Sequence, residues 1–176
     1  NPYGSSKLFS ESVIKDTAFA NETFKFVILR YFNVAGADVD GKIGQSTLNA
    51  THLIKVAAET ALNKRAKMSI FGDDYDTQDG TCIRDYIHVC DLADAHLKAL
   101  KYLDANPSDI FNCGYGYGYS VKEVIDTMKK VSNTDFKVEI VPRRAGDPSN
   151  LISNNTKIKT KMNWTPKYND LELICK

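Results

Sequence analysis

Short apolar segments of strand length alternate with longer helical segments along most of the chain, and this alternation constrains the fold more than any other feature. The clearest segment is residues 25–31 (KFVILRY). A continuous apolar segment this short is typical of a strand that is buried on both faces, as in a parallel sheet covered by helices. The alternation therefore predicts an α/β fold with parallel strand pairing.

Capping residues indicate where several helices begin. Asn1 and Pro2 suit an N-cap and a first helical position, Asp91 suits the N-cap of a later helix, and Ser120 with Glu123 matches a capping box. We expect helices at 1–19, 48–65, 91–103, 120–131, 155–162 and from 170 onward, and strands at 25–31, 68–71, 86–89, 109–113 and 137–141. The buried faces of the first two helices are expected to carry Leu8, Phe9, Val13 and Ile14, and Leu53, Val56, Ala57 and Leu62, respectively.

The charge balance excludes several classes of partner. The 176 residues include 23 Lys or Arg and 22 Asp or Glu, so the net charge is +1 and provides no general attraction for nucleic acid or an anionic membrane. No apolar run approaches the roughly 20 residues that span a bilayer, and the opening NPYGSSK lacks the basic segment of a signal peptide. We therefore expect a cytoplasmic protein with neither nucleic-acid nor membrane partners.

The cysteines and histidines do not indicate a metal site. Cys82, Cys90, Cys113 and Cys175 form no C-x-x-C pair, and the three histidines add no zinc-finger spacing. Two disulfides remain the alternative in a secreted protein. Because Cys90 and Cys113 lie within apolar segments, we expect buried, reduced thiols and no metal.

Tyr3 and Lys7 form the first candidate site. Residues four apart share one face of a helix, so the phenol and the ammonium are expected side by side in the first turns. A neighbouring cation and the positive end of a helix both favour a phenolate, which suits proton transfer to a sugar or alcohol hydroxyl. The spacing alone is equally compatible with an exposed helix face.

Arginines in two loops form the second candidate site. Three of the five arginines in the chain, Arg84, Arg143 and Arg144, lie beside turn residues. Arginine recognises phosphate through two parallel hydrogen bonds, and Asp147 in the same RRAGDP segment suits ribose hydroxyls. Surface solubility is the alternative interpretation.

Two further segments do not match the motif that each suggests. The acidic loop 73–80 fails as an EF-hand, because Tyr75 falls at the first ligand position and Tyr86 where the final Glu belongs. The segment 114–120 (GYGYGYS) lacks the G-x-G-x-x-G spacing of a dinucleotide loop, so we interpret it as a tight strand-to-helix turn.

Several longer strings together carry a family resemblance. They are NPYGSSK (1–7), LRYFNVAGA (29–37), THLI (51–54), SIFGDDYDTQDGTCIRDYIHVCDLADAH (69–96), FNCGYGYGYSV (111–121) and PRRAGDP (142–148). In this order they resemble the nucleotide-sugar epimerases of the extended short-chain dehydrogenase/reductase family, over nearly the whole chain. The resemblance implies the C-terminal part of a Rossmann-type parallel sheet with a smaller α/β substrate-binding lobe. Residues 1–33 would end the NAD-binding domain, and 34–176 would mainly form the UDP-sugar lobe, with 86–121 returning to the Rossmann sheet.

The resemblance also assigns roles to individual residues. Tyr3 and Lys7 are implied as the catalytic base and its partner, and Tyr3, Lys7, Tyr31 and Phe32 as NAD contacts. The implied substrate-binding residues are Asn33, His52, Leu53, Ser69, Phe71, Arg84, Arg144, Asp147 and Leu151. Ser69 and Phe71 resemble the uracil-binding edge, Arg84 and Arg144 the diphosphate clamps, and Asp147 the ribose contact. Some members carry Tyr at the position of Leu151, so a smaller Leu predicts tolerance of 2-acetamido sugars (UDP-GlcNAc and UDP-GalNAc).

The implied reaction is 4-epimerisation of UDP-glucose and UDP-galactose through a 4-keto intermediate, with NAD retained as cofactor and a homodimer as the complete protein. The alternatives are a dehydratase or decarboxylase of the same family, or a non-catalytic nucleotide-sugar binding module.

No strand–helix turn of this chain carries the family's glycine-rich NAD motif, so the resemblance implies the C-terminal portion of a longer enzyme. We expect the isolated chain to bind no NAD and to be inactive, with weak UDP-sugar affinity. We also expect the strand at 25–31 to lack neighbours and to expose an edge.

Overall fold

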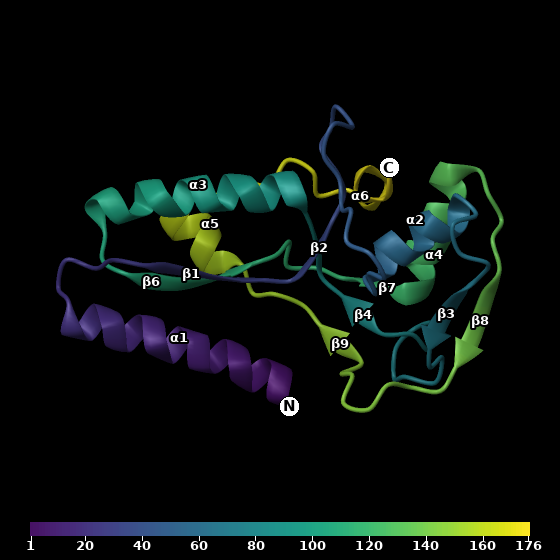
Figure 1. Cartoon of the computed structure of the whole chain (residues 1–176), viewed down its shortest axis with the longest axis horizontal. Helices are drawn as coiled ribbons and strands as arrows, with labels where there is room; N and C mark the ends of the chain where they lie inside the picture. The colour runs from purple at the N-terminus through teal and green to yellow at the C-terminus, as the bar shows by residue number, and fades with distance from the viewer.

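Parallel strand pairs form the framework of the computed structural model, which describes residues 1–176 (Figure 1). The parallel pairs are β1 (Val27–Tyr31) with β6 (Asp109–Cys113), β2 (Asn33–Ala35) with β5 (Tyr86–His88), and β3 (Met68–Phe71) with β8 (Val138–Val141). The short strand β4 (Ile83–Arg84) lies between β7 (Tyr119–Ser120), which is antiparallel to it, and β9 (Asn150–Leu151), which is parallel. These pairings confirm the expected α/β fold with parallel strands.

Six helices cover the strand pairs. They are α1 (Pro2–Ala20), α2 (Leu53–Ala61), α3 (Val89–Ala105), α4 (Val121–Ser132), α5 (Thr156–Met162) and α6 (Leu171–Cys175). Figure 1 shows α1 on one side of the β1–β6 pair and α3 with α5 on the other, while α2, α4 and the β3–β8 pair occupy the opposite end of the elongated molecule. The core extends along both ends and includes Phe111, Ile87, Val124, Ile158, Trp164 and Ile174. No helix is both long and apolar enough to cross a membrane.

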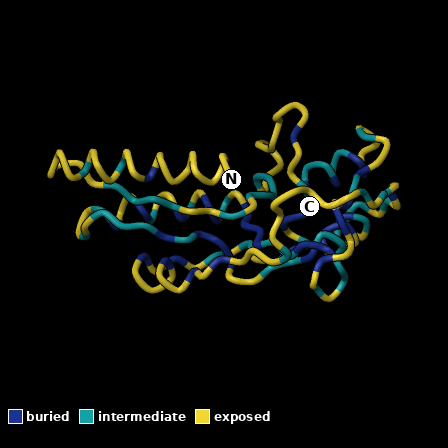
Figure 2. The backbone as a smooth tube through the Cα atoms, turned by 90° about the horizontal axis from the view of Figure 1, so that it is seen from below, coloured by how far each residue is buried: buried dark blue, intermediate teal, exposed yellow.

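The expected buried face of α1 is wrong for three of its four residues, and the fourth, Ile14, is half-buried. Leu8, Phe9 and Val13 are all more than half exposed, and Glu11 is the one buried residue of the helix (Figure 2). Glu11 accepts two hydrogen bonds of 2.6 Å from the guanidinium of Arg30 on β1, and these bonds lower the pKa of the Glu11 carboxyl. The helix therefore contacts the strands through an ion pair, and the apolar residues beside it have no partner in this chain.

The expectations for the strand at 25–31 are also wrong in part. Its neighbour β6 pairs with it over the full length of β1, so the strand does not lack neighbours. It is half-buried at Val27–Leu29 and exposed at Arg30 and Tyr31, so it is not covered on both faces. One edge of β1 has no partner strand in the structure, which agrees with an exposed edge.

Some boundaries and caps also differ from the expected ones. The second helix begins at Leu53 rather than at residue 48, because Asn49 adopts a left-handed conformation (φ 55°) that interrupts a helix. Its buried residues are Ile54, Ala57, Thr60 and Ala61, whereas Leu62 is exposed. The capping box of Ser120 and Glu123 is confirmed.

Asp91 anchors the C-terminal segment and does not cap α3. His88 is the N-cap of that helix, and its ring accepts a hydrogen bond from the Cys90 amide at 3.1 Å. The buried Asp91 carboxylate accepts the Tyr115 hydroxyl at 2.6 Å and the amides of Lys167 and Tyr168 at 2.8 and 2.9 Å. The residues after α5 are thereby held against the start of α3.

The four cysteines are free thiols, and Cys82, Cys113 and Cys175 are buried as expected, whereas Cys90 is half-buried. Burial raises the pKa of Cys113 and of Cys175 to about 12, which keeps both thiols protonated at neutral pH. The structure places no three His, Cys, Asp or Glu residues where they would bind a metal ion together.

Asp109 on β6 provides a pH-dependent contribution to stability. Burial raises the pKa of this carboxyl, but hydrogen bonds from Lys157 and from the Ile110 amide outweigh burial and hold the pKa at about 2. A carboxyl with a lowered folded-state pKa stabilises the fold above its unfolded value of 3.8, and this stabilisation is lost as the pH falls toward 2. The contribution at neutral pH is about 2 kcal/mol.

We expect Asp109→Asn to lower the free energy of unfolding by about 2 kcal/mol at pH 6, and by only about 1 kcal/mol at pH 3. Urea titrations of wild type and variant at the two pH values measure this difference. A gap that stays the same between pH 6 and pH 3 would contradict the assignment.

Candidate functional site

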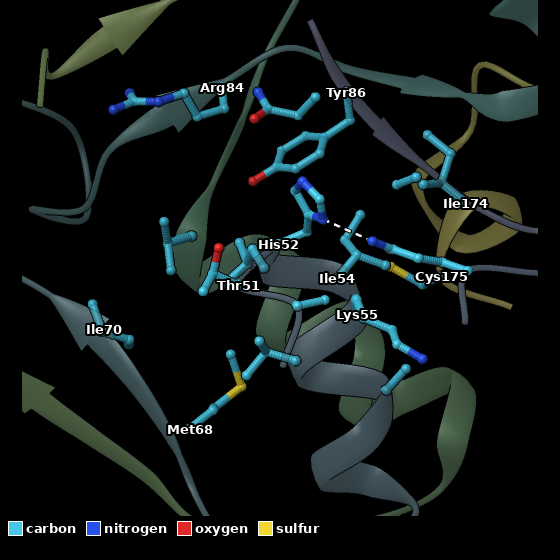
Figure 3. Close-up of a pocket in the computed structure, with 18 of the residues that line it drawn as sticks. Thr51, His52, Ile54, Lys55, Met68, Ile70, Arg84, Tyr86, Ile174 and Cys175 are labelled. Atoms are coloured by element: carbon cyan, nitrogen blue, oxygen red, sulfur yellow. Dashed lines mark hydrogen bonds between the residues drawn. The ribbon is translucent and has the colours of Figure 1, made fainter. Parts of the chain in front are cut away.

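A cavity with a volume of about 690 Å³ lies between α2, β3, β4 and the segment that follows β2 (Figure 3). It brings together residues from distant parts of the sequence. Eight of the nine expected substrate-binding residues line it: Asn33, His52, Leu53, Ser69, Phe71, Arg84, Arg144 and Asp147. The ninth, Leu151, lies outside the lining, as do Tyr3, Lys7, Tyr31 and Phe32.

Asn33 and His52 occupy the ends of two elements that meet at the cavity. Asn33 begins β2, and its side-chain amide donates to the backbone oxygen of Asp85 at 2.9 Å, which fixes the carboxamide at the wall. His52 precedes the first turn of α2, and its Nδ1 lies 2.8 Å from Nε2 of Gln45 (dashed line in Figure 3). The imidazole and the carboxamide thus add polar groups to a cavity wall in which apolar and charged side chains are mixed.

The carboxylate of Asp85, which lies between the cavity residues Arg84 and Tyr86 in the sequence, fixes this part of the wall to the segments 115–116 and 153. It is completely buried and accepts hydrogen bonds from the amides of Tyr115 (2.9 Å), Gly116 (3.0 Å) and Ser153 (3.1 Å), and from the Ser153 hydroxyl (2.6 Å). A Cβ on Gly114 would lie 2.6 Å from the same carboxylate. The segment 114–120 therefore forms a turn around Asp85, in agreement with the strand-to-helix interpretation.

Two guanidinium groups lie on the cavity wall. Arg84 is mostly buried, donates to the Ile83 carbonyl at 2.9 Å, and has Nη2 3.7 Å from an Asp147 carboxylate oxygen. The guanidinium carbon of Arg144 lies 3.6 Å from the centroid of the Phe71 ring. Two fixed positive groups in one concave site suit an anion that carries more than one charge.

Ser69 and Phe71 lie two residues apart on β3, so their side chains point to the same face of the strand. The Ser69 hydroxyl donates to a carboxylate oxygen of Glu139 on β8 at 3.1 Å, so it is engaged within the sheet. Phe71 is partly exposed, and one face of its ring is covered by Arg144. The strand end thus offers an aromatic surface beside the positive groups.

Leu151 lies beside Arg84 rather than in the cavity wall. The two residues are register partners in the parallel pair β4–β9, and the Leu151 side chain is about half exposed (47%). Its location next to a cavity residue brings it close to the site without making it part of the lining.

Tyr3 and Lys7 share one face of α1, as the spacing predicted. The Lys7 ammonium lies 5.2 Å from the centroid of the Tyr3 ring, and Tyr3 is 74% exposed. The N-terminal end of α1 points toward the middle of the molecule's long axis, where the chain leaves β1 through Tyr31 and Phe32 and enters β2 (Figure 1). Ligands of open α/β sheets bind at the carboxyl ends of the strands, and these four residues lie at that end of β1.

A comparison with known protein families identifies the type of fold and site. The family described as "NAD dependent epimerase/dehydratase family" matches residues 1–114. The chain belongs to this family. The match covers α1, the strand pairs β1–β6 and β2–β5, and the part of the cavity that Arg84 lines.

Individual epimerases resemble the chain over almost its whole length. The UDP-glucose 4-epimerase of Azospirillum brasilense is 51% identical over 99% of this chain and 50% of its own length. The solved UDP-Glc/GlcNAc 4-epimerase of Campylobacter jejuni is 65% identical with a TM-score of 0.82, over 99% of this chain and 53% of that one. The Bifidobacterium longum UDP-glucose 4-epimerase, solved with NAD⁺ and UDP, is 36% identical with a TM-score of 0.93, over 99% and 52%. The chain spans about half the length of these relatives.

Sequence reasoning missed several residues that line the cavity. Tyr86 lines the cavity, and burial raises the pKa of its phenol, so the hydroxyl stays protonated at neutral pH. Gly36 also lines the cavity at a positive φ of 79°, and a Cβ there would lie 2.4 Å from the His88 ring. The glycine in the segment NVAGA was the available sign of a close approach, but the sequence does not name the ring that it faces.

Proposed function

We propose that this chain is the nucleotide-sugar-binding portion of a 4-epimerase that acts on UDP-glucose and UDP-galactose. The observation that carries the proposal is the cavity in which Arg84, Arg144 and Asp147 meet Phe71. The size of about 690 Å³ is in the range of small-molecule and cofactor sites. The names of the relatives, and the UDP in the Bifidobacterium longum structure, support the same substrate class.

Each part of a UDP-sugar has a matching group in this cavity. The two guanidinium groups of Arg84 and Arg144 bind the diphosphate, because charge-assisted hydrogen bonds from arginine are the strongest that a side chain offers a phosphate. Asp147, beside Arg84, accepts hydrogen bonds from the ribose hydroxyls. Ser69 and Phe71 form the edge against which the uracil rests. Asn33, His52 and Leu53 line the remaining wall, toward the sugar.

Proton transfer is assigned to Tyr3. Its phenolic oxygen takes up the proton of the sugar hydroxyl at C4, and the Lys7 ammonium lies 5.2 Å from the centroid of its ring. The same phenol returns the proton after the 4-keto sugar has turned over, while the arginines keep hold of the diphosphate. The chemistry that bound NAD would supply here is reversible hydride transfer at C4 of the sugar, and Lys7, Tyr31 and Phe32 are the residues of this chain that would face it.

The residues that would face NAD fit its nicotinamide end. Lys7 forms no ion pair in the structure, so its ammonium is free for ribose hydroxyls. Tyr31 is 56% exposed at the end of β1 and offers an aromatic surface next to Phe32. No segment of this chain supplies a glycine-rich pyrophosphate turn. The chain's own contribution is therefore to the ribose and nicotinamide.

We propose a domain organisation in which residues 1–33 end the NAD-binding domain, residues 86–121 return to it, and the remaining residues of 34–176 form the UDP-sugar lobe. The pairing of β6 with β1 supports this division. We place the complete protein in the cytoplasm as a homodimer. Its partners are the UDP-sugar and NAD.

The experiment uses a chimera in which the N-terminal half of the Azospirillum brasilense relative precedes residue 1. We expect this protein to interconvert UDP-glucose and UDP-galactose, measured by anomeric proton NMR. A chimera that folds, retains NAD and binds UDP without interconversion would favour a non-catalytic binding module. Loss of water from the sugar would favour a dehydratase.

Substrate breadth is the finer part of the proposal. Leu151 is smaller than Tyr and lies beside Arg84, so space for a 2-acetamido group is expected. We predict that Leu151→Tyr in the chimera slows turnover of UDP-GlcNAc at least tenfold while UDP-glucose turnover changes less than twofold. Leu151→Met is the matched control, because it keeps the side-chain volume. Equal rates on both sugars in the Tyr variant would reject this role for Leu151.

A further inference from the structure

The two adjacent arginines of the loop 142–148 have different surroundings. Arg144 lines the cavity, whereas Arg143 does not. The Nε of Arg143 donates to an Asp74 carboxylate oxygen at 2.6 Å, and its Nη2 donates to the backbone oxygen of Asp74. The guanidinium carbon also lies 4.1 Å from the centroid of the Tyr75 ring. Arg143 is therefore engaged by a neighbouring loop and is not available to a ligand.

The loop that receives Arg143 is internally braced. The Tyr75 amide donates to the Gly80 carbonyl at 2.9 Å, and the Thr77 hydroxyl donates to the Thr81 carbonyl at 2.8 Å. The Asp79 carboxylate accepts the Thr81 amide at 2.8 Å and the Ser120 hydroxyl at 2.5 Å, which ties the loop to the start of α4. Residues 73–80 are thus held together by hydrogen bonds, and the loop that contacts Arg143 is itself fixed to the rest of the chain.

Gly72 makes room for the Arg143 side chain. It has a φ of 87°, and a Cβ at this position would lie 2.5 Å from Cγ of Arg143 and 2.9 Å from Cε2 of Tyr75. Its amide donates to the Val141 carbonyl at 2.8 Å, which brings the ends of β3 and β8 together just before Arg143. The segment FGDDY (71–75) therefore leaves the space that the Arg143 side chain occupies.

The loop 142–148 has few other attachments. Its residues are exposed apart from the half-buried Ser149 that follows them, and the hydrogen bonds of Arg143 to Asp74 are the only ones that join the loop to the rest of the chain. The other contacts are the stacking of Arg144 on Phe71 and the 3.7 Å approach of Asp147 to Arg84. Both of these contacts involve side chains that the proposed ligand would bind, so neither would hold the loop once the ligand is present.

We propose that Arg143 is a positioning residue. Its contacts with Asp74 and Tyr75 hold the loop 142–148 so that Arg144 and Asp147 can bind a nucleoside diphosphate. The inference rests on the proposed function of the cavity and adds a residue that does not itself touch the ligand. When UDP binds, Arg144 and Asp147 exchange their present contacts for the ligand, while Arg143 keeps the loop over the cavity.

The test is calorimetric titration of the 176-residue chain with UDP. We expect Arg143→Gln to weaken UDP binding about tenfold, within the range of couplings between contacting residues. Arg143→Lys should restore part of the affinity, because lysine keeps the charge but loses the planar fork and the stacking. Lys129→Gln is the matched control, since Lys129 also combines an ion pair, with Asp135 at 2.6 Å, with an aromatic contact, to Phe136 at 5.5 Å, away from the cavity.

A second measurement needs no ligand. Trypsin cleaves after Arg144, and release of the loop should raise the rate of this cleavage several-fold in Arg143→Gln while the thermal midpoint of unfolding stays near wild type. Unchanged UDP affinity and unchanged cleavage in this variant would overturn the positioning role even though wild type binds UDP. A wild-type chain that binds no UDP would instead contradict the proposed function, and the cleavage rates would then decide the role of Arg143 by themselves.

Discussion

Arg84→Ala is expected to weaken UDP binding to this chain about 100-fold. Arg84 is mostly buried on the cavity wall, so its loss removes charge-assisted hydrogen bonds that water does not replace. The expected cost is about 3 kcal/mol, and each tenfold change in affinity corresponds to about 1.4 kcal/mol. Isothermal titration of wild type and variant with UDP measures the ratio directly.

Two controls separate this effect from a general loss of charge. Arg84→Lys keeps the positive charge without the fork and should bind UDP with intermediate affinity. Lys129→Gln removes one positive charge at the far end of α4 and should bind as wild type does. If Arg84→Ala binds UDP within threefold of wild type while its fold is intact, the diphosphate assignment fails.

Tyr3→Phe is expected to lower epimerase turnover of the chimera by about 10²–10⁴, the usual contribution of a positioned acid or base. The change deletes one hydroxyl from an exposed ring on α1, so the fold should be unaffected. UDP affinity should also be unaffected, because Tyr3 does not line the cavity that holds the nucleotide. Initial rates with UDP-galactose, together with UDP titration, give both quantities.

Tyr31→Phe is the matched control for Tyr3. It deletes the same hydroxyl from another exposed tyrosine at the same end of the strands and should lower turnover far less. Comparable losses in the two variants would show that the hydroxyl of Tyr3 has no special role. A variant that loses UDP affinity and turnover together would indicate a structural defect instead.

The elements that could be predicted are those with local causes. Strands β3 and β6 have the expected bounds, and each is a segment of strand length that buries apolar residues at alternate positions, Met68 and Ile70 in β3 and Phe111 and Cys113 in β6. The start of α4 is also as expected, since a capping box is satisfied by residues three apart. The start of α2 differs, because the left-handed Asn49 depends on the path of the preceding loop rather than on helix periodicity.

Burial was predicted less well than secondary structure. The apolar positions of α1 have the spacing of a buried face, yet Phe9 is 68% exposed, because no other element of this chain packs there. Asp91 has the sequence features of an N-cap, yet it binds amides of residues 167 and 168, which lie far along the chain. Periodicity shows that a face is apolar, whereas its partner is set by the tertiary arrangement.

By itself, the sequence determined the α/β class, the side-by-side placement of Tyr3 and Lys7, and the arginines worth testing. The class depends on the alternation of short apolar and longer helical segments along the chain, and the placement of Tyr3 and Lys7 depends on helix geometry, which fixes the relation between residues four apart. Only the tertiary structure decided that Asn33, His52, Arg84 and Arg144 line one cavity, and that Arg143 beside them does not. Adjacent residues of a loop can point to different partners, and distant segments meet only through strand pairing. The residue types therefore indicate the chemistry of this site, but the fold brings those residues together.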